Sequence, residues 1–462
     1  MSSAETTNVT GNDTGGASPT SPVGGTYAWY VVVILMLAQT VSFVDRMIMG
    51  LLVGPIRESF SISDTQYSLL AGLAFAIFYS LMGLPLARIA DRSNRVRLIG
   101  IAIAFWSLMT ALCGLAKGFW SLFAARIGVG VGEAALGPAA YSIITDYFSR
   151  KTLARALSVY TLGITIGSGL AYVIGGWVVT MAMKTGSVIL PLVGEREGWQ
   201  LTFFLVGLPG LIVVFLVLMI REPARRGIVG TADGSAPPAV PISEAIKFIL
   251  QRRRALFTHI FGVSIFIMVV FSLNIWGPEY LIRTFGFERG DAGSTFGVLM
   301  MIAGTTGLLT GGALGDRWYS KGILDGYSRV ILLSMMGMLP FVIALGFVSS
   351  PVLGIICMGI AVFFSAFQGG IAGGLIQLIA PNQLRGQVVA LYFLIANLIG
   401  MGIGPTVLAT VTDFVFQDDA ALNKSIALSG AVLIPLAALI MLWGLPAIRR
   451  AVEEGKNWES EE

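Results

Sequence analysis

Four ionisable side chains stand inside long apolar stretches, and their types suit the binding of protons and anions. Asp45 and Arg46 lie in the first apolar stretch, and Arg126 and Glu133 lie in the fourth. An ionised group at the centre of a bilayer costs at least about 2.5 kcal/mol, so such residues are rare unless they have a function. A buried carboxylate can hold a proton, and the guanidinium fork suits phosphate. We therefore predict that these four residues form a proton- and substrate-binding site.

The spacing places the four residues at compatible depths. With a helical rise of about 1.5 Å per residue, Asp45 and Arg126 differ in depth by only ~4 Å in a core about 30 Å thick. Glu133 lies roughly 10 Å further along, on nearly the same helical face as Arg126. We therefore expect Asp45 and Arg126 to meet. The alternative is a permanent salt bridge, Asp45–Arg126 or Arg46–Glu133, that only joins the two helices.

A pair of this kind suggests a mechanism of coupling. Burial favours the protonated form of Asp45, whereas a nearby Arg126 favours the ionised form. The carboxyl group can hold a proton while Arg126 is engaged elsewhere. The Asp45–Arg126 pair therefore has two states, joined and separated, and both a proton and an anionic substrate head shift the balance between them. Glu133 would be a second protonation or polar site, and Arg46 would contact the head group or snorkel. Gly130 and Gly137, on the same stripe of the helix, would leave room beside the charges.

The composition indicates a membrane protein. Of 462 residues, 55% are hydrophobic and 12% are charged, about half the usual share of charge in a soluble domain. This excludes soluble enzymes, nucleic-acid binders and disordered proteins. With the single histidine His259, two cysteines and no nucleophile–base pair, we expect no metal site, no cofactor and no enzymatic activity.

Twelve apolar stretches are long enough to cross a bilayer as helices. Because they are apolar on all sides, they do not match the alternation of a transmembrane barrel. The predicted fold is all-α, with twelve transmembrane helices in two six-helix bundles. The predicted spans are 29–52, 67–87, 98–116, 119–142, 157–182, 200–220, 255–276, 294–315, 330–349, 352–379, 387–411 and 426–447.

Charge in the loops predicts the orientation and the domains. Lys and Arg gather in alternate loops, which places those loops and both termini in the cytoplasm. We expect a disordered tail (1–28), an N-terminal bundle (29–220), a linker (221–254), a C-terminal bundle (255–447) and a C-terminal tail (448–462). The linker contains either an interfacial helix or a plain connection. The helix would bury the apolar face formed by Ile242, Ala245, Ile246 and Ile249.

The two halves repeat each other. Asp91-Arg92 after the second span recurs as Asp316-Arg317 after the eighth. Two parallel six-helix repeats are the plan of a rocking transporter. We expect these Asp-Arg pairs to latch the cytoplasmic gate, the alternative being that the arginines only set topology.

The chain resembles the major facilitator superfamily. The loop 87–97 resembles the signature Gly-x-x-x-Asp-Arg-x-Gly-Arg-x-Arg, with Ala87 and Asn94 in place of glycines, and 126–132 resembles the span-4 signature Arg-x-x-x-Gly-x-Gly. Three segments together look like the Spinster branch: Ser42-Phe-Val-Asp45-Arg46, Ile89-Ala-Asp-Arg-Ser-Asn-Arg95 and Gly128-Val-Gly-Val-Gly-Glu-Ala134. The resemblance implies transport of lysophospholipids or sphingosine 1-phosphate, and coupling to protons as in prokaryotic relatives.

The distribution of charge refines this expectation. The predicted spans of the second half contain no Asp, Glu, Lys or Arg, so the pair of bundles suits a molecule with an ionic head and an apolar body. We expect a proton-coupled secondary transporter of lysolipid- or sphingolipid-like molecules that works by alternating access. The alternative is an exporter of drugs or small organic anions. We expect a monomer, surrounded by membrane lipids, in a bacterial inner membrane. Gly400, Gly402, Gly404 and Pro405 predict a kink in span 11.

Overall fold

The structure is a computed structural model that describes residues 25–191, 194–225 and 241–460. Within these ranges the regular secondary structure is helical except for one short hairpin, and twelve helical segments are long and apolar enough to span a membrane. The prediction of an all-α fold with twelve spans is confirmed. Most of the predicted N-terminal tail and part of the linker lie outside the described residues.

The first six spans and their connections form the N-terminal half. Each of these spans is a helical stretch that is apolar over at least the 18 residues needed to cross a membrane. The elements are α1 (Thr26–Met47), α2 (Val53–Phe60), α3 (Asp64–Ser68), α4 (Ala74–Arg92), α5 (Arg95–Cys113), α6 (Phe119–Glu133), α7 (Leu136–Tyr147), α8 (Arg150–Thr185), β1 (Val188–Leu190), β2 (Gly194–Arg196) and α9 (Gly198–Leu218). The two strands pair antiparallel.

The other six spans form the C-terminal half. Its elements are α10 (Ile242–Gln251), α11 (Arg253–Phe285), α12 (Arg289–Leu299), α13 (Thr305–Ser320), α14 (Gly326–Leu345), α15 (Pro351–Ala366), α16 (Gln368–Ile379), α17 (Asn382–Ala396), α18 (Gly404–Thr410) and α19 (Leu422–Ser460). Helix α11 is longer than the predicted span 255–276, and α19 includes most of the predicted C-terminal tail.

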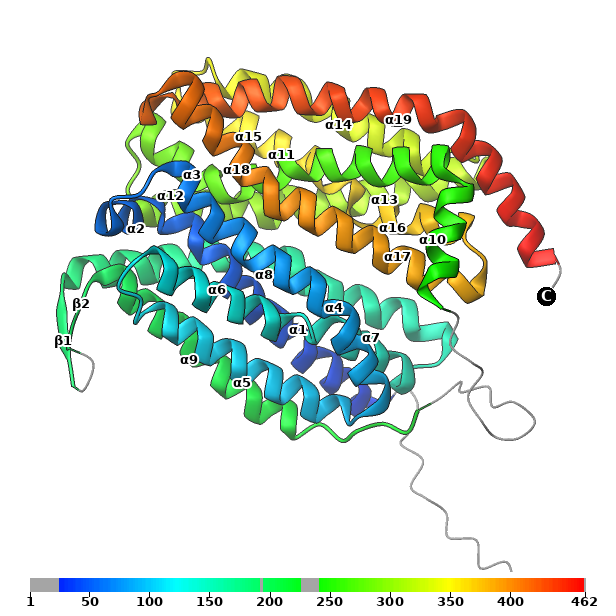
Figure 1. Cartoon of the computed structure of the whole chain (residues 1–462), viewed down its shortest axis with the longest axis horizontal. Helices are drawn as coiled ribbons and strands as arrows, with labels where there is room; N and C mark the ends of the chain where they lie inside the picture. The colour runs from blue at the N-terminus through cyan, green and yellow to red at the C-terminus, as the bar shows by residue number, and fades with distance from the viewer. Residues whose placement is uncertain (1–24, 192–193, 226–240, 461–462) are drawn as a thin grey trace, which may run out of the picture.

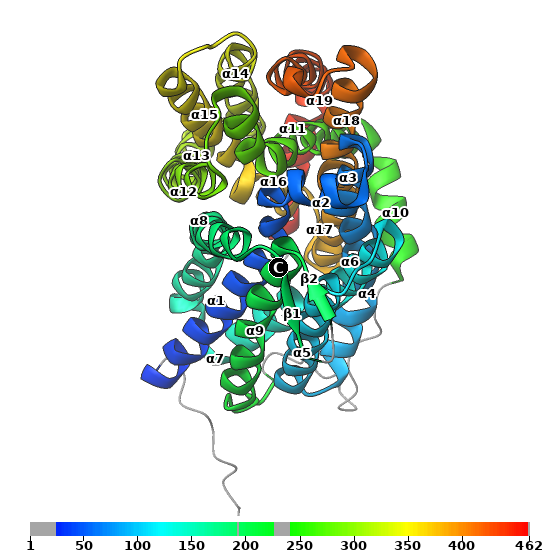
Figure 2. The ribbon, with the colours of Figure 1, turned by 90° about the vertical axis from the view of Figure 1, so that its left-hand side faces the viewer.

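The two halves lie side by side with their helices roughly parallel to the long axis of the molecule (Figure 1). One end of the bundle carries α2 and the β1–β2 hairpin and is called the hairpin end below. The other end carries the C-terminal end of α9 and helix α10 and is called the linker end. Helix α8 of the first half packs on α12 of the second, and α3 packs on α18 (Figure 2).

Glycines make the contact between α8 and α12 close. A Cβ added to Gly293 would lie 2.8 Å from the carbonyl oxygen of Tyr172 and 3.0 Å from the Cα of Gly176. Small residues allow membrane helices to approach at backbone distance, where van der Waals contact holds them together. We call this α8–α12 contact the glycine seam.

Span 11 is interrupted where its glycines predicted a kink. A π-helical segment, Asn397–Ile403, contains Gly400 and Gly402, and α18 begins at Gly404 with Pro405 in its first turn. A π turn leaves the regular hydrogen-bond ladder, which accounts for the interruption.

The linker helix α10 packs on α11 and α17. Its buried residues are Ala245, Phe248 and Ile249, whereas Ile246, predicted on the same face, is exposed together with Leu250. The buried face is therefore rotated relative to the predicted one, and Phe248 takes the place assigned to Ile246.

The glycine seam makes a prediction about stability. Gly293→Ala should lower the melting temperature of the detergent-solubilised protein, because overpacking a close contact costs about 1–3 kcal/mol. The matched control is Gly312→Ala on α13, where an added Cβ meets no atom within 4 Å. Since alanine favours a helix over glycine, this control should melt at the same or a higher temperature. Equal melting temperatures for both variants would contradict the close contact.

Candidate functional site

The four charged residues predicted from the sequence lie together in the N-terminal half, on α1 and α6. Asp45 and Arg126 are 0% exposed, Glu133 is 2% exposed and Arg46 is 7% exposed. Asp45 and Arg46 occupy the last turn of α1, and Glu133 is the last residue of α6. Removing four charges from water costs free energy. That cost has to be offset by contacts among the four charges or with a ligand.

Arg46 and Glu133 form a salt bridge between the two helices. The Arg46 Nη2 and Glu133 Oε2 atoms are 2.6 Å apart, and the Ser42 hydroxyl donates a second hydrogen bond of 2.6 Å to the same oxygen. This is the helix-joining pair that the sequence left open as an alternative. Arg46 is thus engaged by Glu133 in this structure.

Asp45 and Arg126 meet, but through the main chain of Asp45. Arg126 Nη1 donates a hydrogen bond of 3.3 Å to the Asp45 carbonyl oxygen, and no ion pair joins the two side chains among the described residues. The Thr110 hydroxyl and the Trp106 indole N–H of α5 lie beside the Asp45 carboxyl group without reaching hydrogen-bonding geometry. The helical turns that carry Asp45 and Arg126 are therefore adjacent, as their estimated depths predicted. Their side chains, however, do not pair with each other.

Several polar atoms of this cluster have no hydrogen-bond partner within the described part of the chain. They are both carboxylate oxygens of Asp45, Nε of Arg46, Nε and Nη2 of Arg126, and Oε1 of Glu133. Buried polar groups are nearly always paired in folded proteins, and an unpaired one costs about 1–3 kcal/mol. This concentration of open donors and acceptors makes the cluster the candidate functional site.

Helix packing brings the charges together. A Cβ on Gly132 would lie 2.7 Å from the Trp106 Cβ on α5, and a Cβ on Gly130 would lie 2.5 Å from the Phe75 carbonyl oxygen on α4. The expectation that Gly130 leaves room beside the charges is wrong. Its missing side chain instead lets α4 close over them.

The predicted gate residues lie at the linker end and are largely unpaired. Asp91, Arg92 and Arg317 are exposed, and within the described residues none of them forms an ion pair. Asp316 accepts a hydrogen bond of 2.7 Å from the Tyr327 hydroxyl. Their role as a latch remains a prediction.

Arg95 belongs to the same loop motif as Asp91 and Arg92, but unlike them it is buried. Its guanidinium pairs with Asp146, and its Nε lies 2.6 Å from Glu222 Oε1. It also donates to the carbonyl oxygen of Pro223, at the start of the predicted linker. The sequence names Arg95 only as the last residue of a Spinster-like segment and does not predict these buried contacts.

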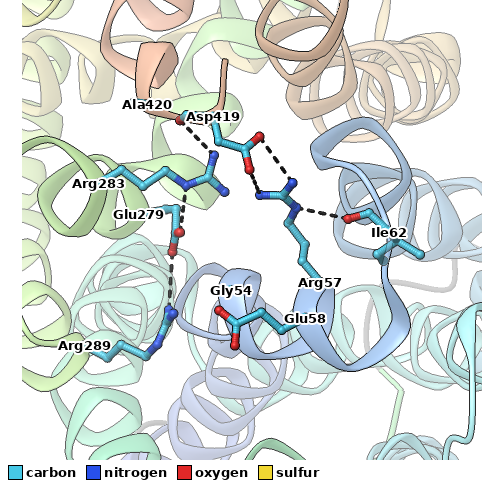
Figure 3. A pocket seen from close by; sticks show the side chains of 9 residues that line it. All are labelled: Gly54, Arg57, Glu58, Ile62, Glu279, Arg283, Arg289, Asp419 and Ala420. Atoms are coloured by element: carbon cyan, nitrogen blue, oxygen red, sulfur yellow. Dashed lines mark hydrogen bonds and ion pairs between the residues drawn. The ribbon is translucent and has the colours of Figure 1, made fainter. Parts of the chain in front are cut away.

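A second charged cluster joins the two halves at the hairpin end, and the sequence analysis did not identify it (Figure 3). Arg283 of α11 binds both carboxylate oxygens of Asp64 on α3, at 2.6 and 2.8 Å. Arg57 of α2 lies 2.9 Å from Asp64 and 2.9 Å from Asp419. Glu279 binds Arg283 at 2.9 Å and Arg289 at 3.4 Å. These six residues are called the hairpin-end network below.

The network was missed because the predicted seventh span ended too early. Glu279 and Arg283 lie on the last turns of α11, beyond residue 276, and Glu279 is 3% exposed. The expectation that the second half contains no charge within its spans is therefore wrong at this end. The spacing of Glu279 and Arg283, four residues apart, is a signal for a continuing helix that could have been used.

Comparison with known proteins identifies the class. Residues 35–405 match the Major Facilitator Superfamily, so the chain belongs to this family of membrane transporters and is a secondary transporter rather than an enzyme. Spinster-like proteins are among its relatives. The chain is 25% identical to protein spinster homolog 1 of Xenopus laevis over 406 residues, which cover 83% of this chain and 72% of that protein.

Two further relatives extend along almost the whole chain. An MFS-type efflux pump of Mycolicibacterium smegmatis is 27% identical over 416 residues, 89% of this chain and 90% of the pump. A crystal structure of a bacterial homologue of the human lysosomal transporter Spinster, inward-facing and unoccupied, is 26% identical. It superimposes with a TM-score of 0.74 and covers 94% of this chain and 98% of its own. The resemblance to the superfamily and to Spinster is thereby confirmed.

The hairpin-end network leads to a prediction. Asp64→Asn should loosen the contact between the halves, because Arg57 and Arg283 lose their shared charged partner and breaking a buried ion pair costs about 3–5 kcal/mol. Amide hydrogen exchange in α2 and at residues 419–421 should accelerate about tenfold or more.

The control is Glu58→Gln, which changes a carboxylate at the same cavity that forms no ion pair among the described residues. It should leave exchange unchanged. Exchange that is equally slow in Asp64→Asn would mean that the network does not hold this end of the molecule closed.

Proposed function

We propose that this transporter moves amphipathic molecules of lysolipid or sphingolipid type by alternating access, in exchange or together with protons. The observation that carries the proposal is the cluster of Asp45, Arg46, Arg126 and Glu133, buried in one half and left with open donors and acceptors. The charged residues of the other half lie near its helix ends. An ionic head and an apolar body fit this division.

The orientation follows from the loop charges. The linker end carries most of the loop Lys and Arg, so the positive-inside rule places it, and both termini, in the cytoplasm. The hairpin end would then face outward, in keeping with a bacterial inner membrane. The two bundles would rock about their interface, with the helices of each half moving as a unit.

Coupling would depend on Asp45 and Arg126. When an anionic head group occupies Arg126, the ionised form of Asp45 loses the support of that arginine, which favours uptake of a proton by the buried carboxyl group. Arg126 has two nitrogens without partners, so it is the better placed of the two arginines to bind an anion. Glu133 would serve as a second protonation site once its bond to Arg46 opens.

The relatives support two substrate classes. The Spinster-like segments of the sequence imply lysolipid-like substrates, and likeness to an MFS-type efflux pump is in keeping with export, as the alternative of drugs or small organic anions requires. Competition would separate them. A lysolipid should displace a bound fluorescent amphiphile from the purified protein at lower concentration than a short-chain organic anion does, and the reverse order would favour the second class.

The role of Asp45 can be tested by transport. In proteoliposomes with an imposed pH gradient, Asp45→Asn should lose gradient-driven accumulation and keep equilibrative exchange, because the amide cannot take up or release a proton. Glu244→Gln is the control, an exposed carboxylate on α10 at the linker end, and it should keep the response to the gradient. If Asp45→Asn still accumulates substrate in proportion to the gradient, the proton site lies elsewhere.

The latch can be tested by accessibility. Asp91→Asn should favour states open at the linker end, because the Asp-Arg motif would hold this end when it shuts. A cysteine introduced at Leu86, on the same helix, should then react faster with a water-soluble thiol reagent. Unchanged labelling would indicate that Asp91 and Arg92 serve topology alone.

A further inference from the structure

Three aromatic rings surround the guanidinium group of Arg46. Its central carbon lies 4.8 Å from the centre of the Phe43 ring, 4.5 Å from that of Phe75 and 4.7 Å from that of Tyr79. Phe43 belongs to α1, and the other two rings stack on each other from α4 with their centres 5.2 Å apart. We call Phe43, Phe75 and Tyr79 the aromatic cage.

The cage has the chemistry of a cation-binding site. The faces of aromatic rings attract positive charge, most strongly where water is excluded, and cages of this kind recognise quaternary ammonium ligands. A carboxylate completes this one, because Glu133 binds the cation in the cage at 2.6 Å and is held by the Ser42 hydroxyl. In this structure the cation is supplied by the chain itself.

The two buried arginines differ in how they are held. Arg126 has one ring within reach, Phe75 at 5.5 Å, and two nitrogens without a partner in the described structure. Arg46 has three rings and a carboxylate around it, yet its Nε also has no partner. Arg126 is therefore open to an anion, whereas Arg46 fills a site that suits a cation.

One ring of the cage is partly exposed. That ring is Tyr79, whereas Phe43 and Phe75 are buried. The side chain of an arginine is long and flexible enough to withdraw its charged end along such a ring. A ligand that carries its own cation can therefore take the place of the guanidinium.

We propose that the aromatic cage and Glu133 bind the ammonium group of an amphipathic substrate, and that Arg46 occupies this site as an internal competitor. This inference rests on the proposed function only in taking the substrate to be amphipathic. It adds that the head group carries a positive charge, beside any negative charge that Arg126 binds. Purely anionic substrates would leave the cage to Arg46.

The test measures binding of decyltrimethylammonium to the purified full chain in a non-ionic detergent, with decyl sulfate as the anionic match. Arg46→Gln should bind the ammonium at least about fivefold more tightly, because the competing guanidinium is gone. Combining Arg46→Gln with Phe75→Leu should abolish this gain, because the ring that attracts the cation is lost.

Arg126→Gln is the matched control, since it removes one positive charge from the same cluster. It should gain little affinity for the ammonium and should weaken binding of decyl sulfate. If both arginine variants bind the ammonium equally tightly and the gain survives Phe75→Leu, charge alone explains the result and the cage is not the site.

A second ring variant guards against misfolding of the combination with Phe75→Leu. Tyr79→Leu added to Arg46→Gln, where no guanidinium competes, should also weaken ammonium binding about fivefold and leave decyl sulfate binding unaltered. Unchanged ammonium affinity would overturn the proposal. These outcomes are separate from the proton assay, because loss of pH coupling in Asp45→Asn does not alter the ammonium affinity of the cage.

Discussion

The rest of this structure depends on the cost of keeping charge inside an apolar bundle. Two carboxylates and two guanidinium groups are buried between α1 and α6, where water cannot solvate them. Their formal charges cancel, and neighbouring helices close in around them: α4 contributes aromatic rings around Arg46, and Thr110 and Trp106 of α5 lie beside Asp45 without hydrogen bonding to it. The close packing of α4 and α5 on the glycines of α6 follows from the same need.

The sequence predicted the elements better than their contacts. Hydropathy identified twelve spans because each must be apolar for its whole length, and rarity of charge identified Asp45, Arg46, Arg126 and Glu133. Side-chain pairing depends on the rotation of each helix about its axis and on rotamers, which spacing does not determine. For this reason the estimated depths brought Asp45 and Arg126 together, while the salt bridge formed between Arg46 and Glu133.

Helix ends were the other weak point. Glu279 and Arg283 lie where the apolar run of span 7 has ended but the helix continues to Phe285. A hydropathy pattern ends at the first charged residues, whereas the helix ends only where its backbone turns, here at Gly286 in a left-handed conformation. The hairpin-end network was therefore hidden in what looked like a loop. Three basic residues of the hairpin end serve contacts between the halves: Arg57 and Arg283 form ion pairs across them, and Arg289 donates a hydrogen bond to the carbonyl oxygen of Leu51.

Helix α11 runs through 33 residues and carries part of this network at its far end. At about 1.5 Å per residue it is a rod of about 50 Å. A tilt of about 10° around its midpoint would displace each end by ~4 Å, as far as the limit at which two charges still count as an ion pair. The contacts of Arg283 with Asp64 would therefore stabilise one orientation of α11. Since one guanidinium binds both carboxylate oxygens, a small rotation of the half either keeps both contacts or breaks them together.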